Sequence, residues 1–212
     1  LTASMTVAGK TYDNTTTATP TFTISSGLVN SQTLTITGTA TFGSSNVGVQ
    51  TATAQTVSLS NGTGLASNYS LSTGQTATAT ITKATLTVTG ATTNVTYNAS
   101  SQSNSGATLS GRQGSDVFTV SGYATATNAA TYTDNLSATS AASANYNISY
   151  VNGSLIIAKA PLTITGATTN VTYNGSAQTN SSATITGRLG ADTIAVTGYA
   201  SGTNAATYND IL

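Results

Sequence analysis

Apolar residues alternate with threonine along much of the chain. The pattern is clear at residues 34–36, 77–81, 86–88 and 162–164. A period of two places the apolar side chains on one face of an extended strand and the polar side chains on the other. No segment keeps the apolar spacing of a helix for more than about two turns. We therefore predict a chain that is mostly β.

Dipeptides that favour tight turns separate these segments. Examples are Asn61-Gly62, Asn152-Gly153 and Asn174-Gly175. They favour turns because Asn and Gly tolerate a positive φ. A short helical turn fits the pattern only around residues 111–115 and 187–191. The strands are expected to form small β-modules, and both an immunoglobulin-like sandwich and a helix-poor β-grasp form fit the pattern.

The chain also repeats itself. Residues 86–136 align without a gap on residues 162–212 at an offset of 76, and 34 of the 51 aligned positions are identical. A more distant first unit shares the same key tyrosine, since Tyr12, Tyr97 and Tyr173 each follow a leucine by 11 residues. A repeat of this length indicates a module in an array.

These matches divide the chain into three repeats. Repeat 1 spans residues 1–84, repeat 2 spans 85–160 and repeat 3 spans 161–212. Repeat 2 continues through residues 145–160 past the point where repeat 3 stops, so we expect repeat 3 to be incomplete at its C-terminus. The junctions leave only about two or three residues of slack between the last strand of one repeat and the first strand of the next. They predict modules arranged end to end as a rod.

Several tyrosines recur at fixed places in the repeats. A large aromatic side chain at the same place in each copy is expected to fill a slot in the module. We predict that Tyr97 and Tyr173 lie in equivalent, largely buried positions. The repeated tyrosines that are candidates for a structural role are Tyr12, Tyr97, Tyr173, Tyr123 and Tyr199.

Composition then excludes several functions. Only 5% of the residues are charged, the formal net charge is zero, and Lys and Arg together number five, whereas ordinary domains are about 25% charged. Nucleic-acid binding and polybasic attraction to membranes both need a basic surface. No apolar stretch approaches the roughly 18 residues of a spanning helix. We therefore expect neither a nucleic-acid partner nor membrane insertion.

The usual catalytic groups are absent as well. The chain has no His and no Cys, and it contains no Glu. It therefore lacks the common general acids and bases and the thiolate nucleophile. We expect no enzyme activity and no cofactor.

The start of repeat 1 resembles a known bacterial repeat. Residues 10–16 read Lys-Thr-Tyr-Asp-Asn-Thr-Thr and are followed by Ala18. This segment resembles the opening of the YDG repeat, in which Tyr-Asp-Gly-Thr-Thr follows a basic residue. Asn14 stands where that repeat usually has Gly, at a turn position. Val-Thr-Tyr-Asn at residues 95–98 and 171–174, with the Gly-Tyr and Asn-Ala-Ala-Thr-Tyr segments that follow, is similar to MBG-type repeats.

The resemblance covers essentially the whole chain and implies a function. YDG and MBG-type repeats are found in the stalks of very large adhesins that bacteria secrete or anchor at the cell surface. These include haemagglutinin-like exoproteins of two-partner secretion systems, with roles in cell adhesion and biofilms. The resemblance implies a spacer that carries an adhesive tip. Any host or matrix glycan or protein would then be bound through other domains of the full chain.

One pair of opposite charges recurs between repeats. Arg112 and Asp116 in repeat 2 correspond to Arg188 and Asp192 in repeat 3. They could share a ligand, but a salt bridge within the turn or a contact between modules is the favoured interpretation. An exposed salt bridge would stabilise the protein little.

Two other uses of charged residues are disfavoured. Asp13, Asp134 and Asp210 could bind calcium, but calcium takes about six to eight oxygen ligands and no segment has two Asp close together. No metal site is therefore expected. Lysines at the junctions, such as Lys83 and Lys159, are interpreted as marking the ends of strands rather than as cross-linking groups.

Two functions remain open at this point. The first is a structural stalk in a secreted or surface-anchored adhesin. The second is a binding module in which each repeat presents a shallow, glycan-binding face of Tyr and Asn, with Tyr123 and Tyr199 as the first candidates. A glycan array would distinguish the two.

Overall fold

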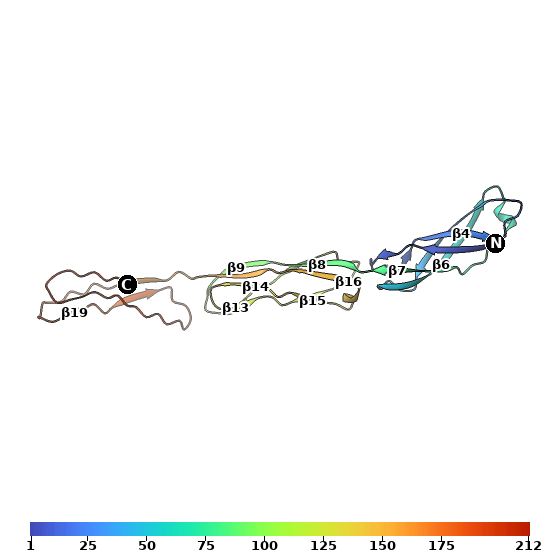
Figure 1. Cartoon of the computed structure of the whole chain (residues 1–212). Coiled ribbons are helices and arrows are strands. Elements are labelled where there is room, and N and C mark those ends of the chain that lie inside the picture. Colours follow the sequence, from blue (N-terminus) through green and yellow to red (C-terminus); the bar gives the residue numbers. More distant parts are fainter. The chain divides into compact units, whose positions relative to one another are not determined.

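The computed structural model describes residues 1–212, and it is almost entirely β (Figure 1). It has no α-helix, and the only helical elements are two single 3-10 turns, η1 (Ala66–Asn68) and η2 (Ser143–Asn145). The predicted β class is confirmed. Residues 111–115 and 187–191 form no helix. Gly114 and Gly190 take φ values of 51° and 56° there, in the left-handed region that glycine tolerates.

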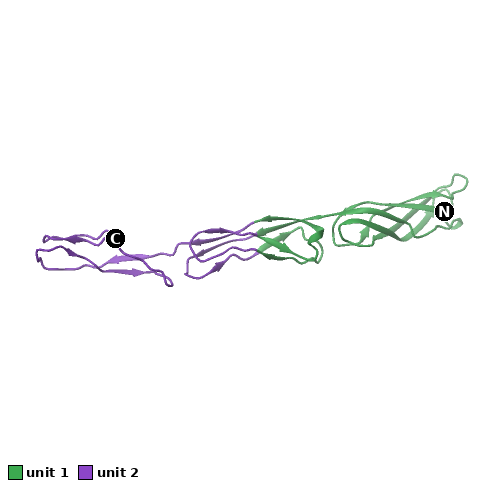
Figure 2. Ribbon diagram, turned by 60° about the horizontal axis from the view of Figure 1, so that its bottom comes forward, with its two compact units in different colours: residues 1–89, 107–121, 136–151 green, residues 90–106, 122–135, 152–212 purple.

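The chain divides into two compact units, each built from several segments (Figure 2). Unit 1 contains residues 1–89, 107–121 and 136–151, and unit 2 contains residues 90–106, 122–135 and 152–212. Unit 1 therefore holds repeat 1 with part of repeat 2. Unit 2 holds the rest of repeat 2 with repeat 3.

Repeat 1 is made of one five-stranded sheet and one strand pair. The sheet has the order β2 (Lys10–Thr11), β7 (Thr76–Thr82), β6 (Gly48–Asn61), β5 (Leu34–Phe42) and β3 (Thr17–Ala18). The pair is β1 (Thr2–Val7) with antiparallel β4 (Pro20–Ser26). It packs on the sheet, with β1 near β7 and β4 near β5. The alternating pattern buries small side chains such as Ala40 and Ala52 together with Phe42 and Ile81 between the two layers.

The part of repeat 2 in unit 1 has β8 (Ala84–Gly90) at its centre. This strand lies between β11 (Ala107–Ser110) and β16 (Tyr146–Val151), and β16 runs parallel to it. A second pair is formed by β12 (Thr119–Ser121) and β15 (Ser137–Thr139). Leu86 and Val88 on β8 are both 0% exposed, so they are the centre of the core there.

The part of repeat 2 in unit 2 has the same layered plan. β17 (Ser154–Ala158) is the middle strand of a three-stranded sheet, between antiparallel β14 (Thr131–Thr133) and parallel β9 (Thr92–Thr96). β10 (Gln102–Ser103) pairs with β13 (Thr125–Ala126). Leu155 and Ile157 of β17 are buried at 0% and 3% exposure, and they supply the apolar centre of this part.

Repeat 3 has fewer strands. β18 (Thr163–Gly166) pairs with β20 (Ala183–Thr186), and β19 (Gln178–Thr179) pairs with β21 (Ser201–Gly202). Residues 168–172 and 207–209, which correspond to β9 and β14, form no strand. Repeat 3 therefore lacks the strand pairing that β9 and β14 make in repeat 2.

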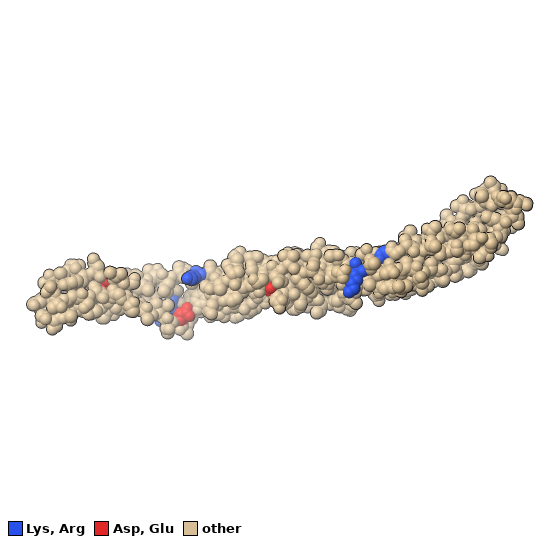
Figure 3. All heavy atoms as spheres, viewed as in Figure 1, with Lys and Arg blue, Asp and Glu red and all other residues tan.

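Charged groups are sparse on the surface seen in Figure 3. No helix in the structure has the length and apolar character needed to cross a membrane.

Candidate functional site: tyrosine and aspartate between repeats

Tyr12 lies where the last strand of repeat 1 ends. Its backbone N–H donates to the carbonyl of Thr82 at 2.8 Å, which extends the parallel pairing of β2 with β7. The turn that follows has Asn14 at φ 61°, in the left-handed region where Asn is one of the few tolerated residues. This position is the one at which the YDG signature has Gly, so the substitution keeps the turn.

The side chain of Tyr12 reaches into repeat 2. Its hydroxyl donates to Oδ2 of Asp116 at 2.9 Å, and Nδ2 of Asn14 donates to Oδ1 at 3.3 Å. The hydroxyl of Tyr146 donates to the same Oδ2 at 2.6 Å. One carboxylate in the loop of repeat 2 therefore accepts hydrogen bonds from two side chains of repeat 1 and from one of its own repeat. All of these residues belong to unit 1.

Aromatic rings enclose this carboxylate. The ring of Tyr146 makes edge contacts with Tyr12 at 5.4 Å between centroids and with Phe118 at 5.1 Å. Tyr12 and Tyr146 are each only 3% exposed. Such edge-to-face pairs contribute about 0.5–1.5 kcal/mol beyond the area they bury. The Tyr146 hydroxyl also accepts the backbone N–H of Gln113 at 2.9 Å.

The electrostatics keep both phenols protonated. Burial, together with the neighbouring Asp116 carboxylate, raises the pKa of Tyr146 to about 12. The same two causes raise the pKa of Tyr12. A phenolate beside a carboxylate would repel it, so the neutral phenol is the stable form. These hydroxyls are hydrogen-bond donors and not nucleophiles at neutral pH.

A second contact joins repeat 1 to repeat 2 within unit 1. Asn145 of η2 accepts the N–H of Val47 through its Oδ1 at 3.0 Å and donates from Nδ2 to Asn46 Oδ1 at 3.0 Å. Asn145 is buried. The Asn-Tyr dipeptide at residues 145–146 thus supplies two neighbouring contacts to the preceding repeat.

Unit 2 makes the equivalent contact between repeats 2 and 3. The N–H of Tyr97 donates to the carbonyl of Ala158 at 2.8 Å, and its hydroxyl donates to both carboxylate oxygens of Asp192 at 2.9 Å. This hydrogen bond is the main cause that raises the pKa of Tyr97. The turn residue Ala99 has φ 61°, and a Cβ at Gly190 would lie only 2.6 Å from the Cβ of Ala99. The corresponding tyrosine, turn and aspartate therefore meet at both junctions, but only Asp116 also accepts from an asparagine and a second tyrosine.

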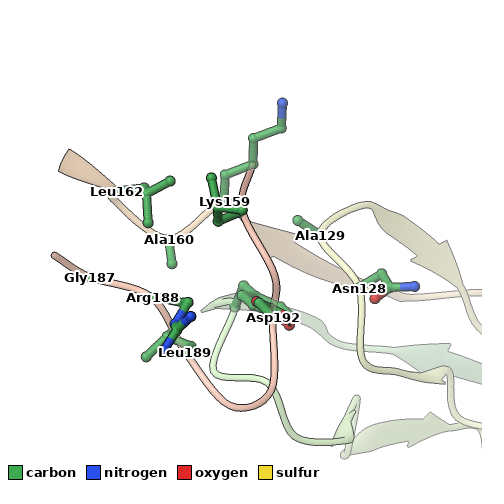
Figure 4. A pocket seen from close by; sticks show the side chains of 11 residues that line it. Asn128, Ala129, Lys159, Ala160, Leu162, Gly187, Arg188, Leu189 and Asp192 are labelled. Atoms are coloured by element: carbon green, nitrogen blue, oxygen red, sulfur yellow. Dashed lines mark hydrogen bonds between the residues drawn. The ribbon is translucent and has the colours of Figure 1, made fainter. Parts of the chain in front are cut away.

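A cavity adjoins the second contact. Its volume is about 390 Å³, and its walls include Tyr97, Leu162, Leu189, Asp192 and Ile194. In Figure 4 the loop with Arg188, Leu189 and Asp192 forms one wall, and the Lys159 ammonium points away from Asp192. The cavity is mostly apolar, with one carboxylate at its edge.

An amide and a carboxylate make the same hydrogen bonds inside repeats 2 and 3, and the pair is buried in repeat 2 and half-buried in repeat 3. Asn104 donates to the Ala91 carbonyl at 2.8 Å and to Asp134 Oδ2 at 2.7 Å, while Asp134 Oδ1 accepts the N–H of Ala124 at 2.8 Å. In repeat 3, Asn180 and Asp210 make the same bonds at 2.7, 2.8 and 2.7 Å. Asp134 and Asp210 therefore stabilise the fold of their own repeats.

The predicted tyrosines have different outcomes. Tyr173 is 61% exposed, so the prediction that it is largely buried is wrong, because no neighbouring segment covers it in the structure. Tyr97 is half-buried at the junction, while its counterpart Tyr12 is fully buried. Tyr123 and Tyr199 are half-buried.

The repeated charge pair separates into two different roles. Asp116 and Asp192 make the contacts between repeats described above. Arg112 and Arg188 are exposed, and neither forms an ion pair. The single salt bridge of the structure joins Lys10 to Asp13 at 2.8 Å. Of the two favoured interpretations, the structure has no salt bridge within the turn, and the aspartates alone make a contact between repeats.

Sequence reasoning missed three contributors to these contacts. Asn14 is marked only as a turn position of the YDG signature, and Asn104 only by its counterpart Asn180, in a chain rich in Asn. Tyr146 is marked in the sequence only as part of an Asn-Tyr pair.

No group of three or more His, Cys, Asp or Glu that could hold a metal ion occurs in the structure. Asp13 instead pairs with Lys10 and accepts from Thr15.

One family model matches the N-terminal part of the chain. Residues 1–79 match the model of the YDG domain, which confirms the YDG-type region at the N-terminus. No curated protein and no solved structure matches this chain.

Proposed function

We propose that this chain is a structural stalk, in which small β-repeats space an adhesive domain away from a bacterial surface. The observation that supports it is the contact between repeats. Tyr12 with Asp116 and Tyr97 with Asp192 form the same hydrogen bond at successive junctions. A contact made by the same residues at each step would give each junction the same preferred geometry, which an array of spacers requires.

The composition supports the same function. A surface of Thr, Ser, Ala and Asn with 5% charged residues offers few sites for nonspecific electrostatic contacts. In this proposal the protein is secreted or held at the cell surface, repeats 2 and 3 are of MBG type, and a host or matrix glycan or protein is bound by other domains. The stalk itself carries out no reaction and needs no cofactor.

Small-angle scattering tests the stalk geometry. A compact chain of this length would have a radius of gyration of about 17 Å. Three repeats of roughly 35 Å placed end to end would form a rod of about 100 Å, for which we expect about 30 Å. A measured value below about 20 Å would contradict the proposal.

Variants at the junctions connect this test to the proposed contact. We expect Asp116→Ala together with Asp192→Ala to broaden the distribution of interatomic distances, because each junction loses its shared acceptor. Asp13→Ala is the matched control, since Asp13 pairs only with residues of repeat 1. An unchanged distribution in the double variant would show that these contacts do not set the geometry.

The alternative function is glycan binding by the repeats themselves. It is favoured by Tyr123 and Tyr199, which are half-buried and form no side-chain hydrogen bond within the protein. A glycan array would favour this function if the wild-type chain binds and Tyr123→Ala with Tyr199→Ala abolishes the signal. The stalk proposal predicts no bound glycan.

A further inference from the structure

The first two strands of repeat 2 pair with its last two strands, and both pairs are parallel. In unit 1, β8 pairs with β16, and Ala84 lies opposite Tyr146. In unit 2, β9 pairs with β17, and Thr92 lies opposite Ser154. A parallel pair has the starts of its two strands at one end. The start of the first strand and the end of the last strand therefore lie at opposite ends of each pair.

Side-chain hydroxyls also connect the two strands of each pair. Thr87 and Ser149 form a hydrogen bond of 3.2 Å between β8 and β16. Thr92 and Ser154 form one of 3.4 Å between β9 and β17. Both bonds join residues that lie directly opposite each other in the register. Any movement of one strand along its partner must therefore break these bonds as well as the backbone ladder.

Repeat 1 has a shorter version of the same pairing. Its strand β2 runs parallel to its last strand, β7. The N–H of Tyr12 continues this pairing to the Thr82 carbonyl at 2.8 Å, as the N–H of Tyr97 continues the pairing of β9 with β17 to Ala158. The hydroxyls of both tyrosines donate to an aspartate of the following repeat. Each tyrosine thus connects the parallel pair of its own repeat to the next repeat.

The strands of these pairs also hold the centre of the core. Four of the five largest fully buried side chains of the protein are Ile81 on β7, Leu86 and Val88 on β8, and Leu155 on β17. Backbone hydrogen bonds beside such side chains are shielded from water, which would otherwise compete for a stretched bond. The interstrand bonds must therefore break before water can replace them.

Strand direction decides how tension along the chain acts on these bonds. Tension pulls the first strand of each pair at its start and the last strand at its end. Because these points lie at opposite ends of a parallel pair, the strands are pulled past each other along their length. All the bonds between them then resist together. If two strands are instead pulled apart at the same end, their bonds break one after another, as in peeling.

The difference in force follows from strand geometry. Peeling one residue pair lengthens the chain by about 6.6 Å, because each strand contributes a rise of about 3.3 Å. Sliding a strand to its next equivalent register also takes about 6.6 Å, since the side-chain period is two residues. Over this distance peeling breaks one residue pair. Sliding breaks all six pairs of β8 with β16 or all five pairs of β9 with β17.

We propose that these parallel strand pairs are mechanical clamps, and that resisting tension along the chain is a further function of the repeats. The proposal rests on the stalk function for the source of the tension, since a spacer between a surface and a bound target is pulled at both ends. The clamp itself depends only on strand direction within each unit. Force measurements and the scattering experiment can therefore fail independently.

Single-molecule force measurements on the full chain test the clamp of unit 1. The chain has no Cys, so two introduced cysteines are the only points of attachment. Lys83→Cys with Val151→Cys pulls β8 at its start and β16 at its end, which slides the strands. Lys83→Cys with Ala144→Cys pulls both strands at their starts, which peels them apart. All three positions are exposed and belong to unit 1.

We expect the sliding attachment to need roughly fivefold more force than the peeling attachment at the same loading rate. It should fail in a single step of roughly 200 Å, because the released chain extends by about 3.3–3.6 Å per residue. The peeling attachment should lengthen gradually. Equal forces for the two attachments, or a larger force for peeling, would overturn the proposal.

A second pair of attachments makes the same comparison in unit 2. Ala91→Cys with Lys159→Cys slides β9 along β17, and Ser100→Cys with Lys159→Cys peels the two strands from their ends. All three positions are exposed and belong to unit 2. The sliding and peeling variants share one cysteine and the same core, so we expect equal stability in urea. A ratio of forces that only follows a difference in that stability would also refute the clamp.

Discussion

Removal of one hydroxyl group, by Tyr146→Phe, is expected to destabilise unit 1 strongly. The variant keeps the ring and therefore its edge contacts with Tyr12 and Phe118. It loses the 2.6 Å hydrogen bond to Asp116 and the acceptor for the N–H of Gln113. Only the polar part of the contact is removed.

The magnitude follows from these two losses. A hydrogen bond to a charged group contributes about 1.5–3 kcal/mol, and a neutral bond about 1 kcal/mol. Tyr146 is 3% exposed, so water cannot readily replace the hydroxyl. We expect the free energy of unfolding to fall by about 2–4 kcal/mol. Asp116 still accepts hydrogen bonds from Tyr12 and Asn14, and these remaining bonds limit the loss of stability.

The assay is urea unfolding followed by circular dichroism, with hydrogen exchange to assign the transition to unit 1. Tyr150→Phe is the matched control. Tyr150 is 41% exposed and its hydroxyl accepts only the N–H of Ala138 at 3.1 Å, so a loss below about 1 kcal/mol is expected. If the two variants lose the same stability within about 0.5 kcal/mol, the reasoning about Asp116 is refuted.

Three other measurements test particular residues. Since the folded pKa of Tyr146 is about 12 against an ordinary 10.0, its contribution is complete below pH 10 and is lost as pH rises from 10 to 12. Urea titrations should therefore show unit 1 weakening in that window, with a smaller slope in Tyr146→Phe. Leu155→Ala should lower the free energy of unfolding by about 2–5 kcal/mol. Ile156→Ala, at a half-buried position, is the control, and an equal or larger loss in that variant would contradict the place of Leu155 in the core. Ala99→Gly should raise thermal stability by up to about 1 kcal/mol, because φ is 61° there and glycine tolerates that region; a lower melting temperature would count against it.

The strand class was predictable because alternation is a local property. Residues 77–81 and 86–88 alternate with threonine, and both segments lie on strands, β7 and β8. The offset of 76 likewise placed Tyr97 with Tyr173 and Asp116 with Asp192 as equivalent residues. These conclusions need only the side-chain order along the chain, since a strand shows alternate residues to opposite faces whatever its neighbours are.

The sequence by itself therefore determined the β class, the repeat equivalences and the YDG-type opening. Only the tertiary structure decided that Tyr12 meets Asp116, 104 residues away, that β16 runs parallel to β8, and that Tyr173 is exposed. Alternation identifies the face of a strand that is buried but not the strand that covers it. A hydrogen bond between repeats joins different positions of two copies, so an alignment of one copy on another cannot reveal it. Burial of a repeated tyrosine depends on the segment beside it, and for Tyr12 and Tyr97 that segment belongs to the following repeat.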